Sequence, residues 1–106
     1  MTKRAFFLSG EEEAELALFG RLIKRARVRR GITQAEIAER TGLARSTVVA
    51  LEAGRPGVAA GAIVGVLAAL GLSGKLANVL ERDELGEELD LAATKRVGRS
   101  SGVADF

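Results

Sequence analysis

The 106-residue sequence contains no histidine and no cysteine. Without these side chains there is no thiol nucleophile, no disulfide, no Ser-His-Asp triad and none of the common zinc ligand sets. The paired carboxylates Glu87 and Glu88 do not replace them, because adjacent residues on a helix point to different sides. We therefore expect no enzymatic activity, no cofactor and no metal. The lack of cysteine also fits the reducing cytoplasm, where we expect the protein to act.

Long apolar runs are scarce as well. Lys3 and Arg4 precede only a short apolar run, so the N-terminus lacks a signal-peptide pattern. Residues 56–74 form an uncharged stretch of 19 positions, close to the about 20 that a membrane-spanning helix needs. This stretch contains a proline and five glycines, and its bulk is alanine and valine rather than leucine and phenylalanine. We interpret it as a turn and a buried helix, and we predict no membrane association.

Positive charge is concentrated in the centre of the chain. The net charge is only +2, but residues 20–57 carry nine basic and three acidic side chains. The two flanking segments, 1–19 and 58–106, each have a net charge of −2. A basic centre between acidic flanks fits a polyanionic partner.

The hydrophobic pattern predicts helices, with no strand alternation in the body of the chain. Ser9 and Glu12 have the spacing of a capping box, so a first helix begins near them and Gly31 ends it. Gly20 either bends this helix or divides it. A stripe that recurs every fourth residue is expected to face the core, namely Leu18, Leu22 and Ala26, with Phe19 and Ile23 beside it.

Four shorter helices are expected after Gly31. Thr33 and Glu36 form a second capping box, and Gly42 ends that helix. A third helix is predicted over about 45–53, with Gly54 ending it, a fourth over about 60–70, and a fifth after Ser73. After about residue 82 we expect one or two amphipathic turns, and residues 95–106 have the composition of a disordered tail.

Residues 31–54 have the pattern of two short helices joined by a tight turn. Ala38 is small where the helices approach each other, and Gly42 allows a positive φ in the connection. The third helix then projects the side chains of Arg45, Ser46 and Thr47 outward. A helix that enters the major groove presents such N-terminal residues to base edges, and arginine bonds O6 and N7 of guanine together. Four apolar side chains seal the underside: Ile37, Leu43, Val48 and Leu51.

From Thr33 to Gly54 the chain resembles the Cro/C1-type helix-turn-helix family, also called the Xre family. The matching pattern is T-Q-x-x-I-A-E-x-x-G-L-x-x-S-T-V-x-x-L-E-x-G. The resemblance implies an all-α, five-helix, lambda repressor-like DNA-binding domain over residues 19–82. An N-terminal arm with a helical extension (1–18) would precede it, and a flexible, partly disordered C-terminal tail (83–106) would follow.

The resemblance also implies roles for single residues. Gln34 matches a glutamine that braces the DNA backbone, and Arg45 and Ser46 match the main base-reading positions. Arg27 and Glu52 match a structural ion pair between the first helix and the edge of the core. The complete set that we expect to contact double-stranded DNA is Thr33, Gln34, Ala44, Arg45, Ser46, Thr47, Val49, Ala50 and Arg55.

The chain departs from the family pattern at three of these positions. Ala44 has no side-chain oxygen to cap the third helix, which removes about 1 kcal/mol of local stability. Val49 and Ala50 have no hydrogen-bonding groups and can contact only thymine methyls. A single module with so little polar readout is weakly selective, because each mismatch costs only about 1–3 kcal/mol. This favours a homodimer on a two-fold operator.

Two functions of different classes follow. The first is a homodimeric transcriptional repressor of its own promoter. Within the family, small chains of this kind resemble HipB-like antitoxins of toxin–antitoxin pairs, whose partner is a HipA-like kinase. The second is a protein–protein adaptor that keeps the fold without specific DNA reading, and the apolar Val49 and Ala50 favour it.

Three features of the sequence each allow two interpretations. The basic side chains of the first helix either form a solvated face or contact phosphates: Arg21, Lys24, Arg25, Arg29 and Arg30. Small residues at intervals of four either pack against the first helix or meet a second subunit: Gly57, Gly61, Gly65 and Ala69. The tail that contains Val103 and Phe106 is either disordered or docks into a partner protein.

Overall fold

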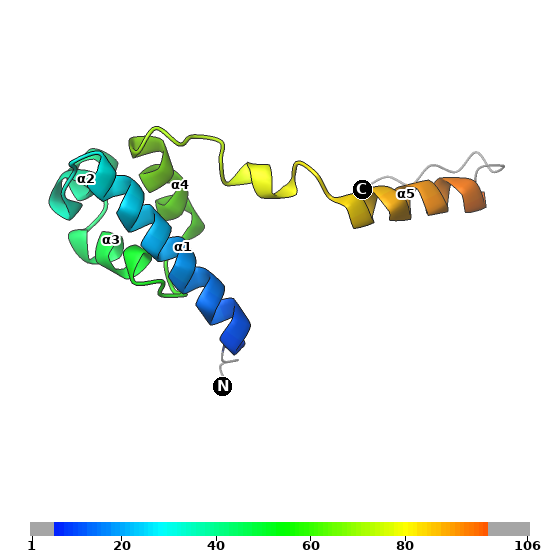
Figure 1. The fold of residues 1–106 in the computed structure, drawn as a ribbon, viewed down its shortest axis with the longest axis horizontal. Coiled ribbons are helices and arrows are strands. Elements are labelled where there is room, and N and C mark those ends of the chain that lie inside the picture. The colour runs from blue at the N-terminus through cyan, green and yellow to red at the C-terminus, as the bar shows by residue number, and fades with distance from the viewer. Residues whose placement is uncertain (1–5, 98–106) are drawn as a thin grey trace, which may run out of the picture. The chain divides into compact units, whose positions relative to one another are not determined.

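The computed structural model describes residues 6–97. Residues 1–5 of the expected N-terminal arm and the part of the tail with Val103 and Phe106 lie outside the described residues. Every regular element within residues 6–97 is helical, which confirms the predicted all-α class. The elements are α1 (Gly10–Arg29), α2 (Gln34–Thr41), α3 (Arg45–Glu52), α4 (Ala60–Ala69), the 3-10 helix η1 (Ala77–Leu80) and α5 (Glu84–Val97) (Figure 1). The chain divides into two compact units, one ending at Leu76 and one beginning at Ala77.

Both predicted capping boxes are present. The Ser9 hydroxyl accepts a hydrogen bond from the Glu12 N–H at 3.2 Å, and the Glu12 carboxylate accepts one from the Ser9 N–H at 3.0 Å. At the start of α2, Thr33 and Glu36 exchange the same pair of bonds at 3.0 and 2.8 Å. Gly42, with φ 75°, ends α2 as expected. These helix ends are therefore specified by residues close together in the sequence.

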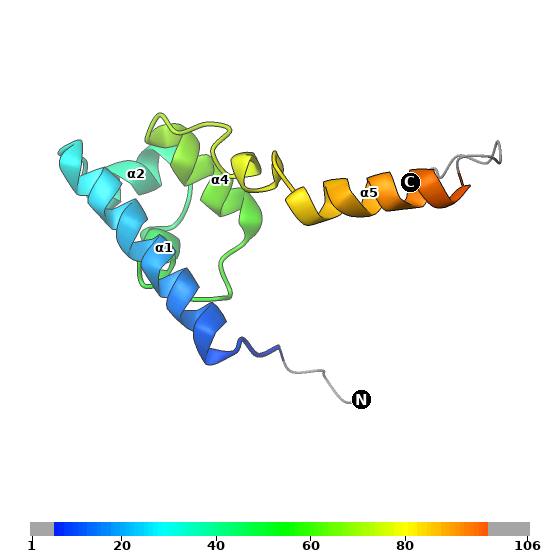
Figure 2. The ribbon, with the colours of Figure 1, turned by 45° about the vertical axis from the view of Figure 1, so that its right-hand side comes forward.

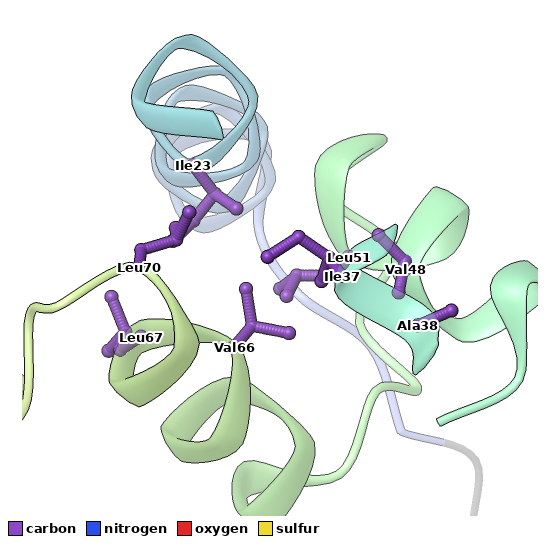
Figure 3. Packing of buried hydrophobic residues seen from close by; sticks show 8 residues of the cluster. All are labelled: Ile23, Ile37, Ala38, Val48, Leu51, Val66, Leu67 and Leu70. Carbon is purple, nitrogen blue, oxygen red and sulfur yellow. The ribbon is translucent and has the colours of Figure 1, made fainter. Parts of the chain in front are cut away.

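The core of the first unit lies between α1 and the three shorter helices. Figure 2 shows α2 and α4 on the same side of the long helix α1. Ile37 of α2 and Val48 of α3 are completely buried. Figure 3 shows how four helices supply the cluster, namely Ile23 from α1, Ile37 and Ala38 from α2, Val48 and Leu51 from α3, and Val66, Leu67 and Leu70 from α4 and its C-cap.

The predicted core side of α1 is wrong at Leu18 and Leu22, whereas Ile23 lies in the core and Phe19 and Ala26 pack against it. Leu18 and Leu22 are 47% and 51% exposed, whereas Gly20, Ile23 and Arg27 are buried. Gly20 decides this rotation, because a Cβ at this position would lie only 2.5 Å from the backbone oxygen of Glu52. The helix is continuous through Gly20. This glycine therefore does not divide α1 but allows the end of α3 to approach it closely.

The three glycines of the small-residue stripe that runs into α4 do not pack closely against another helix, whereas Ala69, the fourth member, packs against the core. A Cβ added to Gly57, Gly61 or Gly65 would meet nothing within 4 Å. The buried residues of α4 are instead Ala62, Val66 and Leu67. Val66 and Leu67 bury more apolar area per residue than the glycines do, and this determines which side of α4 faces the core.

The end of the first unit and the second unit also differ from expectation. Ser73 does not start an α-helix, and Gly74 next to it has φ 82°, in the left-handed region. The chain instead forms turns and then η1. After η1, α5 extends over 14 residues, and the Asp83 carboxylate accepts a hydrogen bond from the Gly86 N–H at 3.0 Å near its start. Residues 95–97, expected to be disordered, belong to this helix.

Within residues 6–97, no helix combines the length and the apolar character that crossing a membrane requires.

Candidate nucleic-acid interface

Helix α3 has one buried side and one exposed side. Val48 and Leu51 are buried, and Arg45, Ser46 and Val49 are exposed. Since successive residues are about 100° apart around a helix, the exposed three share one continuous arc. The outward side thus has an arginine and a serine at its N-terminal end and an apolar side chain one turn later.

The N-terminus of α3 begins without a side-chain cap. Ala44 has the extended conformation of an N-cap residue, with φ −66° and ψ 144°, but its side chain makes no capping hydrogen bond. The Thr47 N–H donates to the Ala44 carbonyl oxygen at 2.9 Å instead. The positive end of the helix dipole is therefore not neutralised by a side chain, which favours a phosphate oxygen near it.

The opposite end of α3 is held by a buried ion pair. The Nε and Nη2 atoms of Arg27 donate to the two carboxylate oxygens of Glu52 at 2.6 and 3.0 Å. The third nitrogen, Nη1, donates to the Ile32 carbonyl oxygen at 2.8 Å. Only 10% of the Arg27 side chain and 4% of the Glu52 side chain are exposed. The pair lies where the family resemblance implies one, and it fixes α1 to α3.

Gln34 joins the same network from the start of α2. Its Nε2 atom donates to Glu52 Oε1 at 3.0 Å, so Glu52 accepts hydrogen bonds from α1 and α2 together. Burial raises the pKa of Glu52, but hydrogen bonds from Arg27 and Gln34 and the charges of Arg27 and Lys24 outweigh this, so the pKa is lowered. The Glu52 hydrogen bond in turn raises the pKa of Arg27, against the effect of its burial. The network is therefore an ion pair at neutral pH.

The expected DNA-contacting residues gather around two hollows beside α3. Arg45 lines one hollow together with Thr33 and Gln34 from the start of α2. Ser46, Thr47 and Ala50 line the other, together with Arg55 from the turn after α3. Ala44 and Val49 are exposed on α3 without lining either one. The structure thus places residues from the start of α2, from α3 and from the following turn around two hollows that α3 residues line.

The comparison with known families identifies the fold. A model of the helix-turn-helix domain matches residues 18–80, more than half of the chain. The chain belongs to this family. It is therefore a DNA-binding helix-turn-helix protein, with α2 and α3 as the two helices of the motif. No curated protein matches the chain. The first two turns of α1 and the whole of α5 lie outside the match.

Apart from the buried Arg27, the basic side chains of α1 and its C-cap are exposed: Arg21, Lys24, Arg25, Arg29 and Arg30. Arg30 donates to the Ala26 carbonyl oxygen at 2.8 Å, and Lys24 is close enough to Glu52 to lower the pKa of that carboxyl. Both a solvated face and phosphate contact are consistent with this exposure.

Sequence reasoning missed two groups of residues in the helix-turn-helix. Pro56, Gly57 and Val58 complete the hollow beside Ser46 and Thr47, which the turn signal after Arg55 already indicated. Gly20 and Gly54 set the spacing between α1 and α3. A Cβ on Gly54 would lie 2.6 Å from the Ala17 Cα atom, and its φ is 75°. Glycine at these positions was interpreted only as a helix bend and a helix stop.

Proposed function

We propose that this protein is a sequence-specific regulator of the Cro/C1 (Xre) type that binds an operator in double-stranded DNA as a homodimer and represses its own promoter. The DNA-binding domain is residues 19–82, the site of action is the cytoplasm, and no catalytic step is involved. The observation that carries this proposal is the exposure of Arg45 and Ser46 on the outward arc of α3 in a chain of the helix-turn-helix family.

The contacts follow from the chemistry of each exposed group. Arg45 bonds a guanine edge in the major groove, and Ser46 bonds a neighbouring base. Thr33, Thr47 and Arg55 bond phosphates on either side of the groove, which sets the register of α3 without reading sequence. Ala44, Val49 and Ala50 offer only apolar contact, such as with thymine methyls.

The Glu52 network supports this reading mode because it is buried and links three helices through one carboxylate. Gln34 reaches Glu52 with its amide nitrogen, so the start of α2 and the end of α3 are tied to one carboxylate. Arg45 and Gln34 line the same hollow. A fixed distance between a backbone-contacting residue and a base-reading residue reduces the entropy lost on binding.

Dimerisation compensates for the limited polar readout of one subunit. A two-fold dimer places two α3 helices in successive major grooves, about 34–36 Å apart, and doubles the number of bases read. Each mismatch costs about 1–3 kcal/mol, so two half-sites give a selectivity that one module lacks.

We also propose, as the biological setting, that the regulator is a HipB-like antitoxin whose protein partner is a HipA-like kinase. This rests on the family resemblance of residues 33–54. A second candidate is a protein–protein adaptor without specific DNA reading, which is favoured by the 43% exposure of the apolar Val49 on the outward arc.

Fluorescence anisotropy with the duplex from directly upstream of the reading frame tests the proposal. We expect tight binding that is lost on a scrambled duplex, with a salt slope that reports the number of phosphates contacted. Arg45→Ala is expected to weaken specific binding about tenfold to a hundredfold. Arg40→Ala is the matched control, because Arg40 is also exposed but lies in the last turn of α2, away from Gln34.

The same anisotropy measurement can also contradict the proposal. Weak binding that is equal on both duplexes and indifferent to Arg45 would exclude specific DNA reading. Capture of a protein partner that depends on Val49 would then support the adaptor.

A further inference from the structure

We propose that α5 is the dimerisation helix, and that it pairs in antiparallel orientation with α5 of a second copy of this chain. The inference rests on the homodimer of the proposed function and names its interface. It involves only the second unit, which lies outside the family match except for η1.

The apolar side of α5 has no partner among the described residues of the second unit. Leu85 and Leu89 are 67% and 59% exposed and lie one turn apart, with Ala92 following on the same side. An isolated helix of about 14 residues is marginally stable in water, and Gly86 lowers its helix propensity further. A second helix that buries this stripe would stabilise α5.

The charges beside the stripe select the partner. Glu84, Glu88 and Lys95 lie along one flank, since their spacings of four and seven residues bring them back to nearly the same side. None of the three makes an ion pair with another described residue of the second unit. Glu84 and Glu88 repel each other at i, i+4, and Lys95 is about 10.5 Å further along the axis than Glu88. The flank is thus acidic at one end and basic at the other.

A second copy in antiparallel orientation complements this flank. With a two-fold axis between residues 90 and 91, the partner's Lys95 lies level with residue 86, between Glu84 and Glu88 and about 3 Å along the axis from each. Leu89 then faces the partner's Ala92, and Leu85 meets the aliphatic stem of the partner's Arg96. A parallel pair would instead place like charges side by side, so the charge pattern favours the antiparallel one.

Charge reversal in the full-length protein tests the interface, with sedimentation equilibrium as the measurement. We expect a dimer whose dissociation constant rises about tenfold or more with Lys95→Glu, because the variant places three carboxylates together in each of two symmetric sites. Combining Glu84→Lys, Glu88→Lys and Lys95→Glu reverses the three charges of this flank and is expected to restore dimerisation. Lys75→Glu has the same charge change outside α5 and serves as the matched control.

Disulfide trapping tests the orientation of the pair. Because the wild-type chain has no cysteine, only the introduced cysteines can form a cross-link. When Leu85→Cys and Arg96→Cys proteins are mixed and oxidised, we expect the cross-link between the two variants to exceed either self-cross-link. Preferential self-cross-linking of Leu85→Cys would indicate a parallel pair and overturn the proposed geometry.

The results separate this inference from the proposed function. A dimer that is insensitive to Lys95→Glu would overturn the α5 interface and leave a dimeric regulator in place. A monomeric wild type at high concentration would overturn both the interface and the homodimer. A dimer that responds as expected but does not distinguish operator from scrambled duplex would support the interface and reject sequence-specific repression.

Discussion

The two ends of α3 are built in opposite ways. At the C-terminal end, Glu52 is buried and accepts hydrogen bonds from Arg27 and Gln34, and Gly20 lets the backbone of α1 approach closely. At the N-terminal end, Ala44 provides no cap, and the neighbouring Arg45 is exposed. The helix is thus anchored at one end and open at the other.

This contrast suggests how a short helix can read DNA. A helix of eight residues has little stability of its own, so its orientation depends on tertiary contacts. The contacts at the Glu52 end supply the orientation and leave the groups at the Arg45 end free for bases and phosphates. Changes at the anchored end should therefore affect folding, and changes at the open end should affect binding.

The largest effect is expected from Glu52→Ala. It leaves Arg27 as a buried charge without its partner, and removing one member of a buried ion pair costs about 3–5 kcal/mol. That is a large part of the free energy of unfolding of a small domain, about 5–15 kcal/mol. Urea denaturation followed by circular dichroism measures the loss. Glu39→Ala, at an exposed glutamate of α2, should change stability by no more than about 0.5 kcal/mol.

A double replacement distinguishes charge burial from a general loss of packing. Arg27→Met together with Glu52→Leu removes both charges and is expected to recover most of the stability. If the double variant were as unstable as Glu52→Ala, the ion pair would not be the source of the effect.

The second largest effect is expected from Gly20→Ala. The added Cβ would lie 2.5 Å from the Glu52 backbone oxygen, so α1 and α3 must separate, at a cost of about 1–3 kcal/mol. Gly61→Ala is the matched control, because its Cβ meets nothing within 4 Å and alanine favours the helix by about 0.5–1 kcal/mol. The thermal midpoints should thus move in opposite directions, and a stabilising Gly20→Ala would refute the close approach.

These glycines also show what the sequence can predict. Capping boxes and glycine stops were predicted correctly, because each depends on residues a few positions apart. The stripe of Leu18 and Leu22 was predicted wrongly, because α1 has apolar residues on two sides and the choice depends on α3, some 30 residues away. In the same way, no local signal distinguishes the buried Gly20 from the open Gly61.

In the candidate site, too, features that depend on neighbouring residues could be predicted from the sequence, and features that depend on distant residues could not. The exposure of Arg45 and Ser46 follows from the motif itself, since the neighbouring apolar positions must face the core. The link from Gln34 to Glu52 spans 18 residues, and only the structure shows that one carboxylate holds both helices. The length of α5 was underestimated because its charged surface gives a weak apolar stripe, although charged residues are good helix formers.

Acid should weaken the anchored end more mildly than side-chain deletion does. The pKa of Glu52 in the folded protein is lowered from its ordinary value of 4.5, so the unfolded chain binds this proton more tightly. The stability from the ionised carboxylate is present above the ordinary pKa and is lost as the pH falls through the lowered one. Urea denaturation between about pH 6 and pH 3 measures this decline. Glu52→Gln should be less stable at neutral pH and show a shallower decline, and equal slopes would mean that other carboxylates dominate.

The smallest effect is expected at the open end, from Ala44→Ser. A serine hydroxyl at the N-cap can accept a hydrogen bond from the first turn of α3, which adds about 0.5–1 kcal/mol of stability. Ala59→Ser is the matched control, since Ala59 is the N-cap of α4 and also makes no side-chain capping bond. Thermal denaturation should show a similar gain for both variants. Only Ala44→Ser is expected to change DNA affinity, because its hydroxyl competes with a phosphate oxygen for the same N–H groups. An equal change in affinity for both variants would mean that the uncapped start of α3 has no part in binding.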